Sequence, residues 1–306
     1  MQAMILAAGF GTRLLPHSAL RPKPLFPVLN TPLLLATIAR LRRVGFNHII
    51  VNAHHLRGQI KAALAGLPGV LLLEEEDILG TGGGLRGAMP YLRPESLLVT
   101  NGDIYHLIDF AEIYQAHCRA AAPVTMVMHD FPRFNTVTVA NGRVIGFDTP
   151  TAAGNLAFTG LHVINPEVLP DIEAGIFSSI IDHYRQLLRQ GVVIRCHDVT
   201  GTFWADMGTE ADYLALHAGL LRREIPRWPE LAVGAVHEPT LPPQQLIDRN
   251  AVISQDCQLD DWLSIGAASI DGGAALARVV VWDGVSISGG VWRDRLLSHK
   301  PEEGRA

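Results

Sequence analysis

Short apolar runs alternate with amphipathic stretches along the first 110 residues. Four of the apolar runs predict strands, at residues 3–8, 48–52, 70–73 and 96–100. Three amphipathic stretches predict helices, at residues 32–44, 56–64 and 85–92. Strands that alternate with helices predict a largely parallel sheet with helices on both faces.

From about residue 123 to residue 222 the pattern is mixed. Five more apolar runs predict strands, at residues 124–129, 136–140, 143–147, 156–164 and 192–198. Asn141-Gly142 predicts a hairpin turn between the second and third of these strands. Helices are expected at residues 178–190 and 209–222, and Thr209 marks the start of the second one.

The composition changes after Glu224, where prolines mark a linker at about 223–245. Beyond the linker, apolar residues recur at intervals of six, at Ile247, Ile253, Leu259 and Ile265 and again at Val281 and Ile287. This period is typical of β-solenoid coils, so residues 246–306 predict a truncated solenoid, with an irregular β-rich tail as the alternative. Its open end predicts either a homo-oligomer contact or packing against the chain's own first domain.

Composition and charge exclude several classes of protein. With 48% hydrophobic and 18% charged residues, most of the chain is not intrinsically disordered. A net charge of −5 argues against a broad nucleic-acid-binding surface. No apolar run approaches the roughly 20 residues that span a membrane, and the first positive charge, Arg13, follows the first apolar run instead of preceding it. We therefore expect a cytoplasmic protein that binds neither nucleic acid nor membrane.

Two segments near the N-terminus have the residues of a phosphate site. After the first strand, Gly9 and Gly11 permit a sharp turn whose N–H groups can face phosphate oxygens, and Arg13 adds a bidentate cation. The loop matches neither a Walker A motif nor the dinucleotide fingerprint, and a plain tight turn is the alternative. Lys23 stands between Pro22 and Pro24, which stiffen the backbone around it, although a solvated loop lysine is commoner.

A second glycine run, at residues 80–84, predicts close approach of the backbone to a base, a phosphate or another strand. The acidic run before it is typical of a solvated face, and from it we choose Glu75 as a candidate reader of a base. Asp103 follows a predicted strand, at the edge where open α/β sheets bind ligands. Asp206 precedes a predicted helix, where a capping role is the alternative. Two converging carboxylates would hold Mg²⁺, with phosphates completing its shell.

The order of these motifs is more specific than any one of them. Gly-x-Gly-Thr-Arg, Pro-Lys-Pro-Leu, Leu-Gly-Thr-Gly-Gly, Asn-Gly-Asp and Trp-x-Asp-x-Gly-Thr follow one another within residues 1–222. In this order they resemble the sugar-1-phosphate nucleotidylyltransferases, most of all the N-acetylmuramate-1-phosphate uridylyltransferases and then the heptose- and mannose-1-phosphate guanylyltransferases. The six-residue repeat is similar to the left-handed β-helix of some relatives, which the muramate enzymes generally lack.

The resemblance implies a fold and a reaction. The fold is a Rossmann-like α/β domain over residues 1–222, with a mixed, mainly parallel sheet and helices on both faces, followed by a short left-handed β-helix. The nucleotide half of the domain is expected at about 1–122 and the sugar half at about 123–222. The reaction transfers a nucleoside monophosphate, with uridylyl slightly favoured, from a nucleoside triphosphate to a sugar-1-phosphate. A nucleotide-sugar sensor of the same fold and a cytidylyltransferase for a non-sugar phosphate are the alternatives.

The resemblance also implies roles for individual residues. Asp103 and Asp206 would hold Mg²⁺, Lys23 would meet the α-phosphate or the sugar phosphate, and Arg13 would grip pyrophosphate. The expected nucleotide-binding residues are Leu6, Ala7, Ala8, Gly9, Gly11, Thr12, Glu75, Gly80, Thr81 and Gly82. The expected sugar-binding residues are Asn135, Asp148, Thr159 and Gly160. Asp148-Thr149-Pro150 stands where many relatives have Glu-Lys-Pro, so the family's lysine is missing, and Arg133 is a candidate to replace it.

Overall fold

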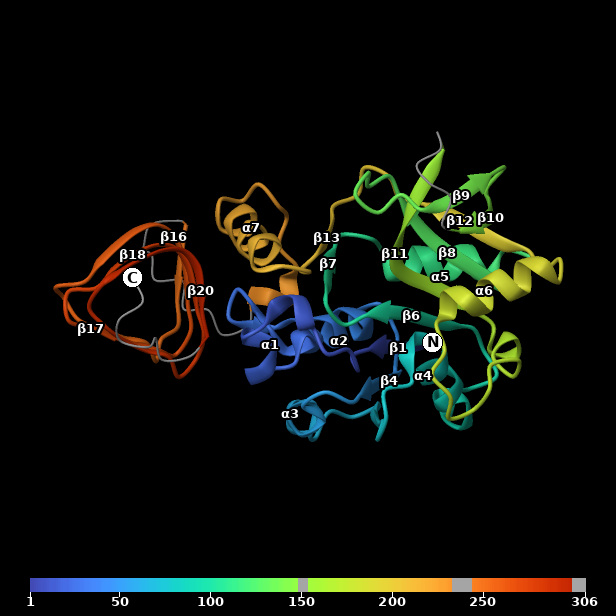
Figure 1. Ribbon diagram of the computed structural model, residues 1–306, viewed down its shortest axis with the longest axis horizontal. Coiled ribbons are helices and arrows are strands. Elements are labelled where there is room, and N and C mark those ends of the chain that lie inside the picture. The colour runs from blue at the N-terminus through green and yellow to red at the C-terminus, as the bar shows by residue number, and fades with distance from the viewer. Residues whose placement is uncertain (148–153, 233–243, 299–306) are drawn as a thin grey trace. The chain divides into compact units, whose positions relative to one another are not determined.

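The computed structural model describes residues 1–147, 154–232 and 244–298 and divides into two compact units (Figure 1). Unit 1 consists of Met1–Phe10 and Ile38–Trp204, and unit 2 of Gly11–Thr37 and Ala205–Ala306. Unit 2 therefore joins a short N-terminal segment to the C-terminal third of the chain. The predicted domain boundaries near 122, 222 and 245 follow the sequence order instead, and they stay predictions.

Unit 1 contains a nine-stranded sheet in the order β5-β4-β1-β6-β11-β8-β12-β10-β9. The first four strands in this order are parallel: β5 (Val70–Glu74), β4 (His48–Ala53), β1 (Gln2–Leu6) and β6 (Leu97–Asn101). The remaining strands are β11 (Asn155–Ile164), β8 (Val124–His129), β12 (Ile194–Asp198), β10 (Arg143–Phe147) and β9 (Val137–Ala140). β11 runs antiparallel to both of its sheet neighbours, so the sheet is mixed, as the fold class predicted.

Helices cover both faces of this sheet. On one face, α4 (Gly80–Ala88) and α6 (Ile180–Arg189) share a buried apolar cluster with alternate side chains of the central strands, such as Met4, Val99 and Met126. The intervening side chains point to the other face and are equally buried. There, α5 (Phe110–Cys118) contacts β8 and β11. Two further helices are α2 (Leu33–Arg43), which runs from one unit into the other, and α3 (Arg57–Leu64).

The second glycine run differs from its prediction. We expected Gly80–Gly84 to be a loop before a helix at 85–92, but α4 begins at Gly80 and contains all of these glycines. A Cβ on Gly83 would lie 2.7 Å from the Ile176 carbonyl oxygen, and one on Gly84 would lie 2.8 Å from the Asn52 amide nitrogen. The glycines therefore allow a helix to approach a backbone segment and two polar side chains, and this close approach offsets their poor helix propensity.

Unit 2 begins with short elements and continues with one long helix. Two single-turn 3-10 helices, Thr12–Leu14 and Lys23–Leu25, flank α1 (His17–Leu20), and the two-residue strands β2 (Pro27–Val28) and β3 (Thr31–Pro32) pair antiparallel. α7 (Glu210–Leu221) begins where predicted. Two other short strands pair with each other: β7 (Ile104–His106), which belongs to unit 1, and β13 (Trp204–Asp206), whose first residue is the last of unit 1. Within the expected linker, residues Pro229–Ala232 form a 3-10 helix, and residues 233–243 lie outside the described residues.

The C-terminal strands stack in parallel, as solenoid coils do. One sheet contains β14 (Gln245–Ile247), β16 (Gln258–Ile265), β18 (Ala275–Val281) and β20 (Val291–Leu297). The other contains β15 (Val252–Ile253), β17 (Ser269–Asp271) and β19 (Ser286–Ser288). Ile265 pairs with Val281 and Ile270 with Ile287, all buried, so apolar side chains stack from coil to coil. This arrangement favours the solenoid over an irregular tail.

None of the described helices is long and apolar enough to cross a membrane.

Candidate active site

The predicted site residues are divided between the two units. Unit 1 carries Leu6, Ala7, Ala8, Gly9, Glu75, Gly80, Thr81, Gly82, Asp103, Asn135, Thr159 and Gly160. Unit 2 carries Gly11, Thr12, Arg13, Lys23 and Asp206. Asp148 lies outside the described residues. We describe each group within its own unit.

In unit 2, the structure brings together three of the predicted residues. The Nζ of Lys23 lies 3.2 Å from Oδ1 of Asp206, and a terminal guanidinium nitrogen of Arg13 lies 3.4 Å from Oδ2 of the same carboxylate. The Lys23 side chain is only 7% exposed and that of Asp206 is 17% exposed, whereas Arg13 is 58% exposed. Two cations thus share one carboxylate, which leaves a net positive charge for an anion such as a phosphate.

Local structure explains how Lys23 comes to be buried. Pro22 is extended, and the 3-10 turn that starts at Lys23 is closed by hydrogen bonds from Leu25 N to Pro22 O and from Phe26 N to Lys23 O. Gly11, with a φ of 65°, lets the chain turn beside it, and a Cβ there would lie 3.3 Å from Cβ of Ser18 and 3.5 Å from Cβ of Lys23. A solvated loop lysine, the alternative to a site residue, does not describe this geometry.

Asp206 is not the cap of the helix that follows it. Thr209 caps α7, accepting a hydrogen bond from Asp212 N while the Asp212 side chain accepts one from Thr209 N. The carboxylate of Asp206 faces the two cations instead. Gly208 completes the arrangement, because a Cβ there would lie 2.7 Å from both Arg13 and Asp206.

In unit 1, a chain of hydrogen bonds runs behind the end of β1. Ala7 N donates to Oδ1 of Asn52 (2.9 Å), and the Asn52 amide donates to Oε1 of Glu75 (2.7 Å). Oε2 of Glu75 accepts a hydrogen bond from Leu79 N, directly before α4. Glu75 is 3% exposed, so this buried carboxylate fixes two predicted nucleotide-binding segments relative to each other. It also lines a pocket of about 240 Å³.

Sequence reasoning missed Asn52, which links the loop after β1 to Glu75. The available signal was a polar residue at the end of the otherwise apolar run 48–52. The turn that carries Asp103 lies beside the same loop, because Gly102 N donates to Leu6 O (2.9 Å). Hydrogen bonds therefore link three of the predicted motifs, at Leu6–Gly9, Gly80–Gly84 and Asn101–Asp103, near the carboxyl ends of β1, β4 and β6.

On the predicted sugar side, the side chains of Thr159 and Asn135 bond within unit 1. The Thr159 hydroxyl donates to Val127 O (2.8 Å) at an irregularity between β11 and β8. Asn135 closes its own turn, accepting from Phe131 N (2.9 Å) and donating to Asp130 (2.7 Å). Gly160, with a φ of 79°, allows close packing, since a Cβ there would lie 2.5 Å from the Asn101 amide nitrogen.

An aromatic group that sequence reasoning did not single out lies beside these residues. Phe131 and Phe134 stack with their centroids 5.6 Å apart, and each makes an edge contact with Trp204. Trp204 is anchored by a hydrogen bond from its indole N–H to Thr159 O (3.0 Å). The Arg133 guanidinium lies 5.1 Å from the Phe134 ring centroid, so this candidate phosphate ligand belongs to the aromatic group.

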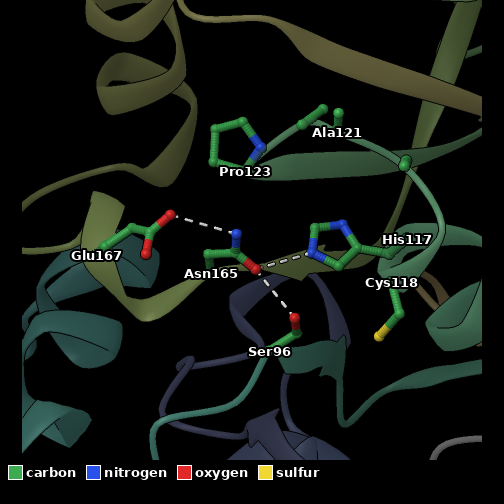
Figure 2. Close-up of a pocket in the computed structure, with 9 residues that line it drawn as sticks. Ser96, His117, Cys118, Ala121, Pro123, Asn165 and Glu167 are labelled. Atoms are coloured by element: carbon green, nitrogen blue, oxygen red, sulfur yellow. Dashed lines mark hydrogen bonds between the residues drawn. The ribbon is translucent and has the colours of Figure 1, made fainter.

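A larger pocket, of about 480 Å³, contains none of the predicted residues (Figure 2). Its polar side chains bond one another: Asn165 is hydrogen-bonded to His117 (3.1 Å), Ser96 (2.9 Å) and Glu167 (3.3 Å). Ser96 precedes β6, whereas Asp103 follows it, so this pocket opens at the opposite edge of the sheet. It is therefore separate from the predicted nucleotide site.

The described residues include no group of three or more histidine, cysteine or acidic side chains that would hold a metal ion by themselves. This fits Mg²⁺ in its usual role beside phosphates, because it then takes one or two carboxylates and completes its shell with phosphate oxygens and water. Asp206 is an oxygen ligand of the required type beside a cationic cluster. The assignment of Asp103 and Asp206 to Mg²⁺ stays a prediction.

Comparison with known proteins agrees with these motifs. The chain is 29% identical over 309 residues to the mannose-1-phosphate guanylyltransferase of Mycobacterium tuberculosis, an alignment that covers 95% of this chain and 82% of that protein. It is 33% identical over 220 residues to the N-acetylmuramate alpha-1-phosphate uridylyltransferase of Neisseria meningitidis serogroup B, covering 68% of this chain and 94% of that protein. The crystal structure of HddC from Yersinia pseudotuberculosis shares the fold with a TM-score of 0.60 at 22% identity, over 70% of this chain and 97% of that one. The model of the nucleotidyl transferase family matches residues 2–223. The chain belongs to the nucleotidyl transferase family, as its ordered motifs indicated.

Proposed function

We propose that this protein transfers a nucleoside monophosphate from a nucleoside triphosphate to a sugar-1-phosphate, giving a nucleoside-diphosphate sugar and pyrophosphate. The observation that carries the proposal is the cluster of Arg13, Lys23 and Asp206, all within the residues that the family model matches. A buried lysine and an arginine beside one carboxylate suit a substrate with several phosphates better than a neutral ligand.

The reaction needs positioning and charge stabilisation more than covalent chemistry. An oxygen of the sugar phosphate attacks the α-phosphorus, and the bond from that phosphorus to the oxygen bridging to the β-phosphate breaks, so pyrophosphate leaves with the electron pair. Lys23 would hold the α-phosphate or the sugar phosphate during the transfer. Arg13 and the backbone of residues 9–12 would bind the leaving pyrophosphate.

The base and the sugar would bind mainly to unit 1. The backbone at Leu6–Ala8 and at Gly80–Gly82 would face the base, with Glu75 either contacting it or fixing the two segments through Asn52 and Leu79. Thr159 and Gly160 would line the sugar side. Bound Mg²⁺, held by Asp103 and Asp206, would neutralise part of the phosphate charge.

Two observations favour different bases. The resemblance of residues 81–84 (Thr-Gly-Gly-Gly) and 101–103 (Asn-Gly-Asp) to the N-acetylmuramate-1-phosphate uridylyltransferases favours uridylyl transfer, the activity for which the Neisseria relative is named. The C-terminal coils favour guanylyl transfer to a mannose or heptose phosphate, because the alignment with the mycobacterial enzyme covers 95% of this chain and the alignment with the uridylyltransferase covers 68%. A sensor with little turnover is less well supported, because a protein that only binds nucleotide sugars would not need the buried Lys23–Asp206 pair for phosphate transfer.

A pyrophosphate-release assay tests the proposal. Five nucleoside triphosphates (UTP, GTP, CTP, ATP and dTTP) are crossed with the 1-phosphates of N-acetylmuramate, mannose, glucose, N-acetylglucosamine and a heptose, in the presence of Mg²⁺. We expect turnover with one pair, lost in Asp206→Asn and kept in Asp256→Asn, an exposed aspartate of the C-terminal coils. Nucleotide binding without turnover for any pair would contradict the proposal and favour the sensor.

Three further predictions of the proposal can be tested by other experiments. Fractionation of the source cells tests the cytoplasmic location. Sedimentation of the full chain tests a homo-oligomer formed through the C-terminal segment. Solution of a crystal structure would settle whether the coils wind as a left-handed helix.

A further inference from the structure

Trp282 belongs to the solenoid, but its side chain contacts residues that lie outside the coils. It follows β18 and is 2% exposed. Its ring lies 4.7 Å from the Phe26 ring at 71°, and the Arg21 guanidinium lies 4.6 Å from its centroid. Its indole N–H donates to the hydroxyl of Tyr213 in α7 (3.3 Å). All four residues belong to unit 2.

These partners surround the segment that carries Lys23. Arg21 precedes Lys23 by two residues, and Phe26 closes the 3-10 turn that begins at Lys23. Tyr213 donates a hydrogen bond to Pro27 O, one residue further on. The ring of Trp282 thus contacts the chain on both sides of the buried lysine, and through Tyr213 it also contacts the helix that follows Asp206.

Two further contacts tie the coils to the same segments. The Asn30 amide donates to Ile265 O (2.7 Å) and hydrogen-bonds to Ser264 (3.1 Å), both in β16. Leu296 N, in β20, donates to Glu210 at the start of α7 (2.7 Å). Within unit 2, these contacts favour packing of the tail against residues of the predicted first domain, and they do not test the predicted homo-oligomer.

We propose that the C-terminal solenoid is a positioning element for the phosphate-binding cluster, with Trp282 as the positioning residue for Lys23. This inference rests on the proposed function. Lys23 has to hold one place while it is paired with Asp206, and the 3-10 turn that carries it is too short to be stable alone. Packing of Arg21 and Phe26 on a rigid coil supplies the missing constraint, and it acts on the transfer step, where small displacements are costly.

The test compares three variants of the full chain. Trp282→Leu removes the aromatic contacts, whereas Trp282→Phe keeps a ring and loses the indole hydrogen bond. Ile287→Ala is the matched control, since it opens a cavity in the solenoid core at the sheet of β15, β17 and β19, whereas α7 packs on strands of the other sheet, β16, β18 and β20. Initial rates and hydrogen exchange are measured at a temperature where all the variants are folded.

We expect Trp282→Leu to lower kcat by about 10- to 100-fold while the KM for the nucleotide changes by less than about threefold, because the base-binding backbone lies in unit 1. Trp282→Phe should keep kcat within about threefold, and Ile287→Ala within about twofold. The amides of Leu25, Phe26 and Leu29 should exchange at least about tenfold faster in Trp282→Leu than in Ile287→Ala.

Equal exchange and equal kcat in Trp282→Leu and Ile287→Ala would overturn the inference and reduce Trp282 to a packing residue. Hydrogen exchange also separates this failure from failure of the proposed function. If the wild-type protein shows no turnover while exchange at Leu25 and Phe26 responds only to Trp282→Leu, the reaction assignment is wrong but the structural coupling stands. If turnover is present and exchange does not respond, only the positioning role fails.

Discussion

The pair formed by Lys23 and Asp206 can be tested by removing each charge and then both. At the observed 3.2 Å, two unit charges attract by about 5 kcal/mol at an effective dielectric constant of about 20. Most of this is offset, because both groups gave up water when they were buried and because Arg13 still faces the carboxylate. For a charge-assisted hydrogen bond in this setting, a net coupling of about 1–3 kcal/mol is expected.

The assay is a double-mutant cycle with Lys23→Met, Asp206→Asn and the combined variant. The free energy of unfolding of each protein is measured by urea denaturation at pH 7, with unfolding followed by tryptophan fluorescence. The single variants should each lose stability, and the combined variant should lose about 1–3 kcal/mol less than the sum of the two. A coupling below about 0.5 kcal/mol would show that the two side chains do not interact in solution, and the description of the cluster would then be wrong.

Turnover gives the cycle a second readout. Lys23→Met should lower kcat by about 100- to 1000-fold, the loss typical of removing one group that stabilises developing charge. Lys23→Arg should not restore the rate, because a planar guanidinium does not fit the place of a compact ammonium that is 7% exposed. Full rescue by arginine would indicate that only the charge matters, and not its position.

Three further predictions concern unit 1. Gly160→Ala should lower the melting temperature by several degrees in thermal denaturation, because φ is 79° and its Cβ would lie 2.5 Å from the Asn101 amide. Asn52→Leu should weaken nucleotide binding in calorimetry by roughly tenfold, since it leaves the buried Glu75 carboxylate without one partner. His162 is buried, both of its ring nitrogens have no hydrogen-bond partner within the described residues, and burial lowers its pKa from 6.5 to about 3. As the pH falls, His162 is protonated in the unfolded chain near pH 6.5, well before it is protonated in the folded protein. The stability that is present above pH 6.5 is therefore lost as the pH falls towards 3. In urea denaturation, His162→Leu should lose less stability between pH 7 and pH 4.5 than the wild-type protein does.

The elements that sequence predicted well are those whose signals are local. The start of α7 is an example, because Thr209 and Asp212 satisfy each other's backbone within three residues. The four parallel strands are another, since their apolar runs are continuous and bounded by turns. The coils followed from a period, although the structure spaces them by 16 to 18 residues per turn at positions such as Ile247, Ile265 and Val281.

The elements that sequence missed depend on distant partners. Gly82–Gly84 were predicted to precede the helix because glycine has a poor helix propensity, which is a local quantity. The reason for glycine here is not local, because side chains at these positions would collide with Asn52, with Glu75 and with a backbone segment almost 100 residues away. The role of Asn52 was difficult to predict, because its hydrogen-bond partners, Ala7 and Glu75, are distant in the sequence and come together only in the folded chain. Residues Gly11–Thr37 form one compact unit with the C-terminal third of the chain, and this too depends on contacts between distant segments. No pattern within either segment predicts it.

Which sugar binds depends on the hydrogen-bonding groups that the proposed sugar side can still offer after the hydrogen bonds within unit 1 are made. The Thr159 hydroxyl is used by the neighbouring strand, and the Asn135 amide makes one hydrogen bond from each end within its own turn. Among the described residues, the Thr159 hydroxyl has used its one proton, whereas the Asn135 amide can still donate one hydrogen bond and accept another. If the sugar binds here, as we propose, the backbone at Gly160 and the faces of the aromatic group would also contribute to specificity, and neither follows from matching motif letters. This explains why the motifs identify the family, while relatives named for two different sugars match the chain at similar identity.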